Sequence, residues 1–331
     1  MVLDGESLLL APRADELIAA SEGSGLPGTL KSELFASALE LTTDVCESAE
    51  EAAEALAELR RGAAALAEEK GLRVAAAGTH PISRPEDQEI ADEERYTEFV
   101  DYAGISARRQ GVSGLHVHVG MPSADACFHA LEGVLPWLPV VLALSANSPY
   151  LSGEETGMLS NRAEVLAQLP RSGAPPAFRS YAEWEEFVEL FARLDMAAEY
   201  TRFWWDIRPH PRFGTLEIRM PDQPTALERT ADFASLLVEL CRAVLDRPQR
   251  TWEPAARGLY QQNRWAAARF GLAAELFHPD GKHTAKAGEL AEELAGERMD
   301  VSTTEADRQL EVGRSRGLEA VCADLVERTL G

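Results

Sequence analysis

Two short stretches of the sequence combine apolar residues with side chains that could bind a metal ion or a phosphate. Residues 115–120 alternate apolar side chains with His116 and His118, and a second stretch alternates them with Glu217 and Arg219. This period of two is typical of a strand with one packed face and one open face. Carboxylates and imidazole can bind a divalent cation, and a guanidinium group fits phosphate oxygens. The predicted open faces therefore suit a complex of metal and nucleotide.

A third strand-like stretch, residues 38–42, adds Glu40 opposite its apolar residues. Each feature also has an ordinary interpretation. A lone His-x-His is more often solvent-exposed or part of a common hydrogen-bond network. Glu217 and Arg219 are equally compatible with a cross-strand ion pair on a solvated sheet face. The aromatic run at residues 203–205 is better explained by packing than by stacking on a ligand.

The elements that must position these residues follow from turn, capping and periodicity signals. Asp4-Gly5 predicts a hairpin within residues 1–10, and Ser48 with Glu51 predicts the start of a helix that ends at Gly71. The remaining expectations are a strand at 72–77, a polar loop at 84–95, an apolar helix ending near Asn147, a Pro/Gly-rich loop at 170–176, an aromatic helix after Ser180, and helices from Thr225 onward with an interruption at 247–254.

Composition limits the fold and the partners. The chain has 331 residues, 45% of them hydrophobic, with no linker between segments of different composition, which favours one domain over residues 1–331. We expect an α+β fold in which helices cover a mixed or antiparallel sheet. Because the chain has 55 acidic and only 32 basic residues, nucleic acid is a poor partner.

Cysteine usage and hydropathy point to a protein of the cytoplasm. The four cysteines are far apart and form no CxxC pair, so they suggest neither a zinc site nor a disulfide framework. The longest apolar run, residues 134–146, contains two prolines and is too short to span a membrane. The N-terminus lacks the basic-then-apolar order of a signal peptide. We therefore expect a cytoplasmic protein without a membrane partner.

Five segments match a known family, in the family's order. They are residues 114–120 (Gly-Leu-His-Val-His-Val-Gly), 144–149 (Leu-Ser-Ala-Asn-Ser-Pro), 160–162 (Ser-Asn-Arg), 206–210 (Asp-Ile-Arg-Pro-His) and 214–219 (Gly-Thr-Leu-Glu-Ile-Arg). Together they closely resemble the carboxylate-amine ligase family, also called glutamate-cysteine ligase type 2, over nearly the whole chain. This resemblance places the chain in the glutamine synthetase superfamily. It implies a curved, mainly antiparallel sheet whose concave face holds ATP and divalent metal, with helices on the convex face.

The resemblance also implies roles for individual residues. Glu33, Glu40, His116 and Glu217 become candidate metal ligands, Arg219 a phosphate contact, and Arg162 a contact to substrate carboxylate or phosphate. Glu33 and Glu40 lie seven residues apart, which would place them on opposite faces of a regular strand. A turn or bulge between them is therefore required.

The implied reaction uses ATP with Mg²⁺, or Mn²⁺, to phosphorylate a substrate carboxylate, and an amine then attacks the acyl phosphate. The expected partners are small molecules, with glutamate and cysteine the first substrates to test, and a homo-oligomer is compatible with the sequence. Such chemistry needs no side-chain nucleophile. The sequence indeed has no Gly-x-Ser-x-Gly elbow, no P-loop and no dinucleotide-binding glycine motif.

The chain departs from the family at one point. Family members usually open with a strand of several consecutive glutamates, immediately before the segment that matches residues 1–4 here. We therefore expect the first half of the N-terminal strand, and part of the anionic cage for metal, to be lacking. Two function classes remain: a ligase, with weak activity in this form, and a catalytically inactive nucleotide-binding or regulatory relative of the same fold.

Overall fold

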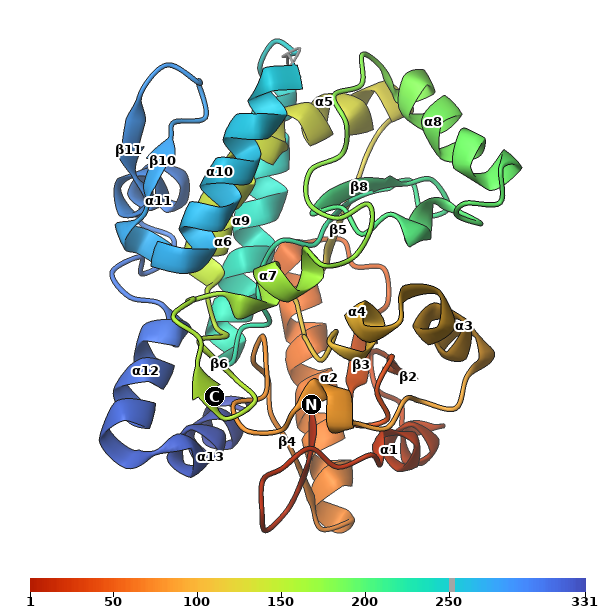
Figure 1. Cartoon of the computed structure of the whole chain (residues 1–331), viewed down its shortest axis with the longest axis vertical. Helices are drawn as coiled ribbons and strands as arrows, with labels where there is room; N and C mark the ends of the chain where they lie inside the picture. The colour runs from red at the N-terminus through yellow and green to blue at the C-terminus, as the bar shows by residue number, and fades with distance from the viewer. Residues whose placement is uncertain (250–253) are drawn as a thin grey trace.

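The structure, a computed structural model, describes residues 1–249 and 254–331, with the side chain of Pro254 left aside. Its strands are β1 (Val2–Asp4), β2 (Gly28–Ser32), β3 (Leu39–Thr43), β4 (Leu72–Val74), β5 (Val117–Gly120), β6 (Tyr150–Leu151), β7 (Glu154–Glu155), β8 (Ile207–His210), β9 (Thr215–Ile218), β10 (Glu275–Phe277) and β11 (Thr284–Lys286). Its helices are α1 (Ala14–Ser21), α2 (Ala49–Glu69), α3 (Glu94–Ala103), α4 (Ile105–Arg108), α5 (Ala124–Val134), α6 (Leu138–Ser145), α7 (Asn161–Leu166), α8 (Tyr181–Arg193), α9 (Leu227–Leu245), α10 (Pro254–Phe270), α11 (Ala287–Ala295), α12 (Glu305–Arg316) and α13 (Leu318–Arg328). The expected mixture of helices and antiparallel strands is confirmed (Figure 1).

Within the described residues, the strands form five small sheets instead of one large curved sheet. β9 lies between β5 and β8, and the other sheets are the pairs β1–β4, β2–β3, β6–β7 and β10–β11. Every pair is antiparallel. Because the strands span only two to five residues, each ladder of backbone hydrogen bonds ends before it reaches the next. The single curved sheet is therefore not seen among these strands.

The central strand β9 fixes which side chains meet. Its residue Glu217 lies directly opposite His118 of β5 and opposite Arg208 of β8. Leu216 and Ile218 are fully buried on the other face, as their alternation predicts. The register of this three-stranded sheet thus brings the side chains of Glu217, His118 and Arg208 together.

An apolar helical layer supports this sheet. α5, α6, α9 and α10 pack around one core, and every residue of α6 is buried (Figure 1). Residues Ala124–Ser145 are long and apolar enough to cross a membrane, with a mean hydropathy of 1.6, but 78% of an 18-residue segment within them is buried inside the protein. This burial is the behaviour of a core helix.

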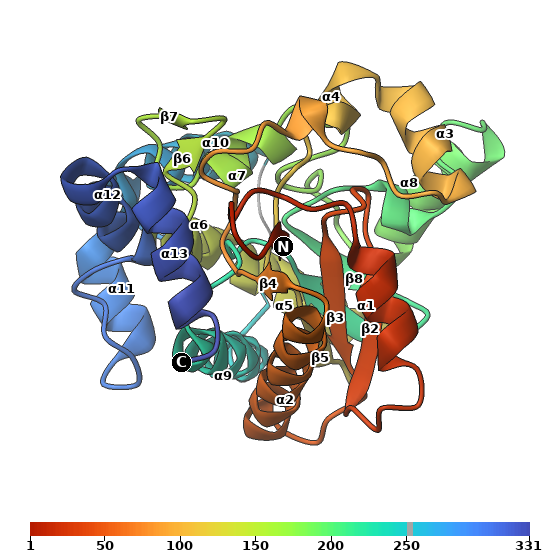
Figure 2. The same ribbon diagram turned by 90° about the horizontal axis from the view of Figure 1, so that it is seen from below.

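The predicted start and end of α2 are confirmed. The Ser48 hydroxyl accepts the Glu51 backbone N–H at 3.1 Å, and Gly71 adopts a φ of 69° just after the helix. α2 packs against α9 (Figure 2), where its buried Arg60 donates to the carbonyl oxygens of Pro224 and Thr225 at 2.9 and 2.6 Å. Helix α2 therefore ties the N-terminal third of the chain to the segment that follows β9.

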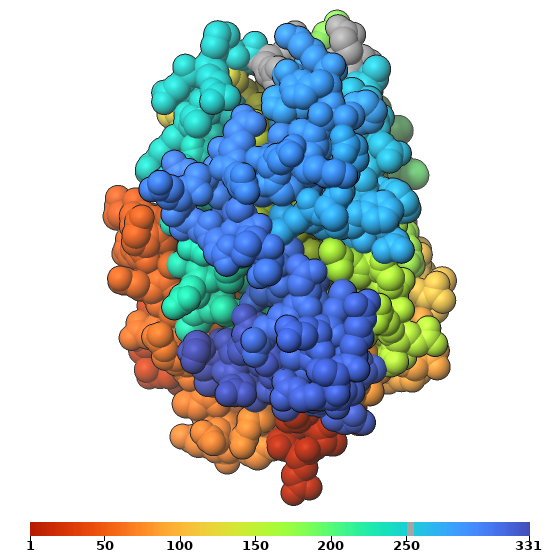
Figure 3. All heavy atoms as spheres, turned by 90° about the vertical axis from the view of Figure 1, so that its left-hand side faces the viewer, coloured from red at the N-terminus to blue at the C-terminus, as the bar shows by residue number. Residues whose placement is uncertain are grey.

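Two expectations about the second half of the chain need correction. β8 was not expected as a strand, although its residues lie in the 206–210 segment. The region after residue 225, expected to be helical, contains the β10–β11 hairpin besides its helices. These strands have three or four residues each, too few for a period to show in the sequence. Half of the expected interruption at 247–254, residues 250–253, lies outside the described residues. Figure 3 shows α10 to α13 spreading over one side of the molecule.

Candidate active site

The predicted site residues lie in two sheets. His116, Glu217 and Arg219 lie on or beside the β5–β9–β8 sheet, whereas Glu33 and Glu40 belong to the β2–β3 hairpin, drawn below that sheet in Figure 1. The two sheets are not joined by strand pairing. They are nevertheless close enough that the charge of Arg219 acts on Glu33.

Glu217 is the centre of the first group, and it is buried instead of solvated. Arg208 Nε donates to its Oε2 at 2.6 Å, and Arg219 Nη1 donates to its Oε1. Burial by itself would raise the pKa of Glu217, but Arg219 and Arg208 outweigh it and hold that pKa well below its usual range. Glu217 is therefore ionised with both oxygens already engaged by guanidinium groups.

Two histidines approach the same carboxylate. His116 Nδ1 and His118 Nε2 each lie 3.9 Å from Glu217 Oε1. Desolvation by the surrounding protein, followed by the charge of Arg219, lowers the pKa of His116 well below its usual value. Burial likewise lowers the pKa of His118. At neutral pH both rings are therefore neutral, the form in which imidazole can bind a cation.

The backbone just after β9 contains a bulge that aims Arg219. Val117 pairs with Ile218, but the next bridge joins Gly114 to Asp222, so the β9 side has one extra residue. The carbonyl oxygens freed there, on Arg219 and Met220, accept hydrogen bonds from Arg162 at 3.0 and 3.1 Å. The buried Arg162 thus holds the bulge in place of strand pairing.

Gly114 is required for this arrangement. A Cβ atom at position 114 would lie 2.0 Å from Arg162 Nη2, so only glycine lets the guanidinium pass. Burial lowers the pKa of Arg162 to about 10, partly offset by Asp222 at 3.8 Å. In this position the side chain of Arg162 contacts the backbone of the bulge, and its direct contact to substrate stays a prediction.

Asp222 anchors the end of the bulge through buried hydrogen bonds. It is fully buried, and it accepts hydrogen bonds from the hydroxyls of Ser148 and Ser160 at 2.6 and 2.8 Å and from the backbone N–H of Asn147 at 2.9 Å. These residues come from the 144–149 and 160–162 segments, so their role is to fix the strand that carries Arg219.

The second group of predicted residues is the pair Glu33 and Glu40. Lys31 pairs with Glu40 in the β2–β3 register, and a turn between the strands returns Glu33 toward Glu40, as the odd spacing required. Burial, followed by the charge of Glu40, raises the pKa of Glu33 to about 7. Glu40 itself is exposed, and it accepts the Thr42 hydroxyl at 2.9 Å. Two carboxylates thus face each other with no ion pair from either to a basic side chain among the described residues.

These donors fit a divalent cation in part. Carboxylate oxygens crowded together are the ligands that Mg²⁺ or Mn²⁺ prefers, which suits Glu33 and Glu40. Glu217 fits less well, because both its oxygens bind arginines. In the described part of the chain, the four predicted ligands do not form a cluster with all donor atoms within 4.8 Å of one another. Glu33 and Glu40 therefore remain the better candidates of the four.

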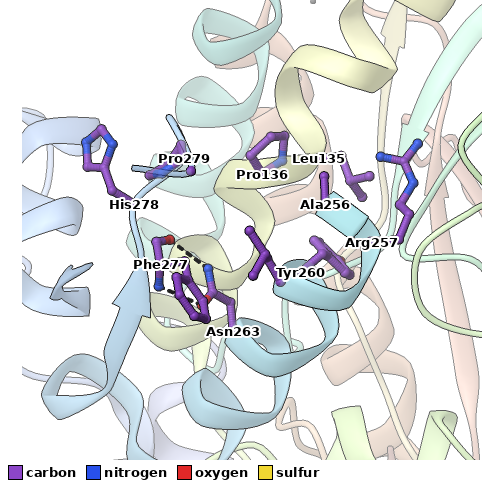
Figure 4. Close-up of a pocket in the computed structure, with 11 residues that line it drawn as sticks. Leu135, Pro136, Ala256, Arg257, Tyr260, Asn263, Phe277, His278 and Pro279 are labelled. Atoms are coloured by element: carbon purple, nitrogen blue, oxygen red, sulfur yellow. Dashed lines mark hydrogen bonds between the residues drawn. The ribbon is translucent and has the colours of Figure 1, made fainter. Parts of the chain in front are cut away.

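A pocket lies in another part of the molecule. It is lined by residues of α10 and the β10–β11 turn, including Tyr260, Asn263 and His278, and by none of the predicted site residues (Figure 4). The predicted chemistry is therefore not located in this pocket.

Comparison with known proteins places the chain in a family. The model of glutamate-cysteine ligase family 2 matches residues 4–322. A protein of Rubrobacter xylanophilus, provisionally named glutamate-cysteine ligase 2-3, is 40% identical over 95% of this chain and 86% of its own length. A Herpetosiphon aurantiacus protein, provisionally named glutamate-cysteine ligase 2, is 34% identical over 91% of this chain and 84% of its own length. The chain belongs to the glutamate-cysteine ligase family 2.

A solved structure has the same fold as this family member. It is the crystal structure of glutamate-cysteine ligase from Francisella tularensis in complex with AMP, with a TM-score of 0.71. The match covers 100% of this chain and 86% of that one, at 15% sequence identity. The similarity therefore concerns the fold.

Sequence reasoning missed two residues that build the site of this glutamate-cysteine ligase family 2 protein. Arg208 engages Glu217, and Asp206 accepts from Tyr260 at 2.7 Å and Arg264 at 2.9 Å while its carbonyl oxygen accepts the Arg219 N–H. Both lie in the 206–210 segment that carried the resemblance. Only Ile207 and Pro209 alternate with polar neighbours there, a run too short to identify β8 from the sequence.

Proposed function

We propose that this glutamate-cysteine ligase family 2 protein is an ATP-dependent ligase that joins the side-chain carboxylate of glutamate to the amine of cysteine through an acyl phosphate. The observation that carries the proposal is the Glu33–Glu40 pair, held within reach of the charge of Arg219. Burial, followed by the charge of Glu40, raises the pKa of Glu33 to about 7, and a bound cation would relieve the repulsion between the two carboxylates. The names of the relatives supply the choice of substrates.

Charge compensation is the main task in phosphoryl transfer to a carboxylate. A divalent cation held by Glu33 and Glu40 would neutralise phosphate oxygens, and Arg219 would contact them directly. In such a contact Nη1 would keep its bond to Glu217, and the other guanidinium nitrogens would meet the phosphate. His116, neutral and 37% exposed, offers a further donor or acceptor beside the same charge.

Arg162 acts in this proposal by positioning Arg219. Its guanidinium binds the carbonyl oxygen of Arg219 itself and that of Met220. Loss of these bonds would free the bulge and misdirect the side chain that meets phosphate. A direct contact of Arg162 with substrate is a separate prediction, and the effect of an Arg162 substitution on KM tests it.

The proposal covers the whole chain, residues 1–331, as one ligase domain. Support comes from Arg60, whose guanidinium contacts the carbonyl oxygens of Thr225 and of Thr329, so one buried side chain joins three distant parts of the sequence. We also propose that the two separate sheets, β2–β3 and β5–β9–β8, form the sides of one concave nucleotide site. A cytoplasmic location suits a supply of ATP and free amino acids.

The decisive experiment measures phosphate release by the purified protein with ATP, Mg²⁺, glutamate and cysteine. Release should require both amino acids, and Glu33→Gln with Glu40→Gln should abolish it, whereas Glu155→Gln, which removes an exposed carboxylate elsewhere, should not. Phosphate release that is independent of either amino acid contradicts the substrate assignment.

A second candidate is a nucleotide-binding relative without ligase activity. It is favoured by one observation, the engagement of both Glu217 oxygens by arginines, which leaves this carboxylate unavailable to metal. The same preparation distinguishes the two, because this candidate would bind ATP in a calorimetric titration and release no phosphate with any amine.

A further inference from the structure

The turn between β10 and β11 brings two histidines and an aspartate together. His278 lies opposite His283, because the Phe277–Thr284 pair precedes them in register and the His278 N–H donates to the His283 carbonyl oxygen at 2.8 Å. Within the turn, the Gly281 N–H donates to the His278 carbonyl oxygen at 2.8 Å. Gly281 adopts a φ of 74°, a conformation that glycine adopts without strain. The backbone therefore fixes both histidines on the same side of the hairpin.

The three side chains converge on a single point. Asp280 Oδ1 lies 3.0 Å from His278 Nδ1 and 3.4 Å from His283 Nδ1. The two imidazole rings are stacked, with centroids 4.3 Å apart and planes inclined by 19°. Among the described residues, this is the one group of three or more His, Cys, Asp or Glu side chains whose donor atoms all lie within 4.8 Å of one another.

We propose that His278, Asp280 and His283 form a binding site for a divalent transition metal of the zinc class. Bonds of about 2.0–2.2 Å from zinc to nitrogen or oxygen place two tetrahedral ligands about 3.4 Å apart. The 3.4 Å between His283 Nδ1 and Asp280 Oδ1 matches this geometry, and the 3.0 Å between His278 Nδ1 and Asp280 Oδ1 is somewhat shorter. Two imidazoles with one carboxylate favour zinc, nickel or copper over magnesium, which prefers oxygen ligands.

A fourth residue orients the first histidine. Glu293 of α11 lies 3.6 Å from His278 Nε2, the ring nitrogen that faces away from Asp280. A carboxylate on that side favours a proton on Nε2, whereas Asp280 Oδ1, at 3.0 Å, favours a proton on Nδ1. Metal binding through Nδ1 requires the form with the proton on Nε2. His278 Nδ1 indeed accepts the Asp280 backbone N–H at 3.1 Å. A metal ion must displace this weak bond, which sets a modest cost on binding.

The hairpin is anchored and still open to solvent. Asn263 of α10 exchanges two hydrogen bonds with the backbone of Phe277, at 2.7 and 2.8 Å, just before the turn (Figure 4). His283 is 56% exposed, so water can complete the coordination of an ion held there. The site shares no residue with the candidate active site and does not depend on the proposed ligase activity.

The test is a calorimetric titration of the metal-free protein with Zn²⁺ in excess Mg²⁺, combined with NMR of the histidine ring protons. The first equivalent should shift the signals of His278 and His283. His283→Gln and Asp280→Asn should weaken this event at least about tenfold, and Glu293→Gln by about tenfold. Asp280→Asn keeps an oxygen to accept the Lys282 N–H, so the turn should still fold.

His129→Gln, which changes a histidine on α5, is the matched control and should bind Zn²⁺ like the wild type. The proposal is overturned if the first equivalent shifts His116 and His118 instead. It is equally overturned if His283→Gln and Asp280→Asn bind Zn²⁺ with wild-type stoichiometry and affinity, because the stacked rings would then serve only the turn.

Discussion

The candidate active site contains a single buried carboxylate and a separate pair of carboxylates, and the two differ in how their charge is balanced. Glu217 is buried between Arg208 and Arg219, and its pKa is held well below the usual range despite burial. Glu33 and Glu40 face each other across the β2–β3 hairpin, and the pKa of Glu33 is raised to about 7. The protein itself neutralises the first group, whereas neither carboxylate of the second forms an ion pair with a basic side chain in the part of the chain that the structure describes.

This difference separates the residues of the site that stabilise the fold from the residues that could bind a cation. A buried charge that is fully paired fixes a strand register and resists change. A pair of carboxylates that repel each other and form no ion pair opposes folding slightly and attracts a cation instead. We therefore expect substitutions in the Glu217 group to act first on stability, and substitutions in the Glu33–Glu40 pair to act first on metal binding and activity.

The largest expected effect is that of Glu217→Gln on stability. An amide would leave the buried Arg208 and the partly buried Arg219 beside each other without their shared charge, at a cost of about 3–5 kcal/mol in the free energy of unfolding. Urea denaturation followed by circular dichroism measures this. Glu155→Gln is the control, because its partner Arg314 is 62% exposed and the pair should contribute little. Equal denaturation midpoints for the two variants would contradict the buried role of Glu217.

Much of this arrangement could be predicted from the sequence. The alternation in residues 115–120 and 215–220 placed His116, His118 and Glu217 on one face of paired strands, and the spacing of Glu33 and Glu40 required the turn that is present. These successes share a cause: period and spacing are local properties of a strand.

The remaining features depend on contacts between distant segments. The bulge at Arg219 arises because Arg162, 57 residues earlier, takes the carbonyl oxygens that β5 would otherwise bind. Arg208 covers Glu217 because β8 pairs with β9, and a four-residue strand leaves little periodicity to detect. The division into small sheets likewise follows from where each ladder stops, which no local pattern encodes.

A second prediction concerns the arginine that joins the two groups. Arg219→Ala should weaken ATP binding in the presence of Mg²⁺ by about 10- to 100-fold, because the phosphate loses a charge-assisted hydrogen-bond donor. Arg208 still pairs with Glu217 in this variant, so the fold should persist. Calorimetric titration with ATP and Mg²⁺ measures the affinity. Equal affinities for the wild type and Arg219→Ala would show that the phosphate assignment is wrong.

A third prediction uses the raised pKa of Glu33. Below pH about 7 this carboxyl group carries a proton in the folded protein, and a cation must displace it. The Mg²⁺ affinity should therefore rise about tenfold per pH unit below 7 and level off above it, since one proton is released per ion bound. Titrations at pH 6, 7 and 8 test the profile. Glu33→Gln should bind weakly at every pH, and a steep profile in that variant would assign the titration to another group.

The smallest expected effect has the opposite sign from the first. A carboxyl group whose pKa is raised by folding stabilises the protein below its unfolded pKa of about 4.5, and this contribution is lost as the pH rises to about 7. At pH 8 without metal, Glu40→Gln should therefore raise the melting temperature by about 1 °C, because it removes the charge that opposes ionisation of Glu33. The glutamine oxygen can still accept the Thr42 hydroxyl, so the change is confined to charge. At pH 5, where Glu33 is protonated, the two proteins should melt together, and saturating Mg²⁺ at pH 8 should reverse their order because only the wild type keeps both ligands. A melting temperature that falls in Glu40→Gln at pH 8 without metal would mean that the hairpin carboxylates, like Glu217, are already balanced by the protein, and the contrast between the two groups would not hold.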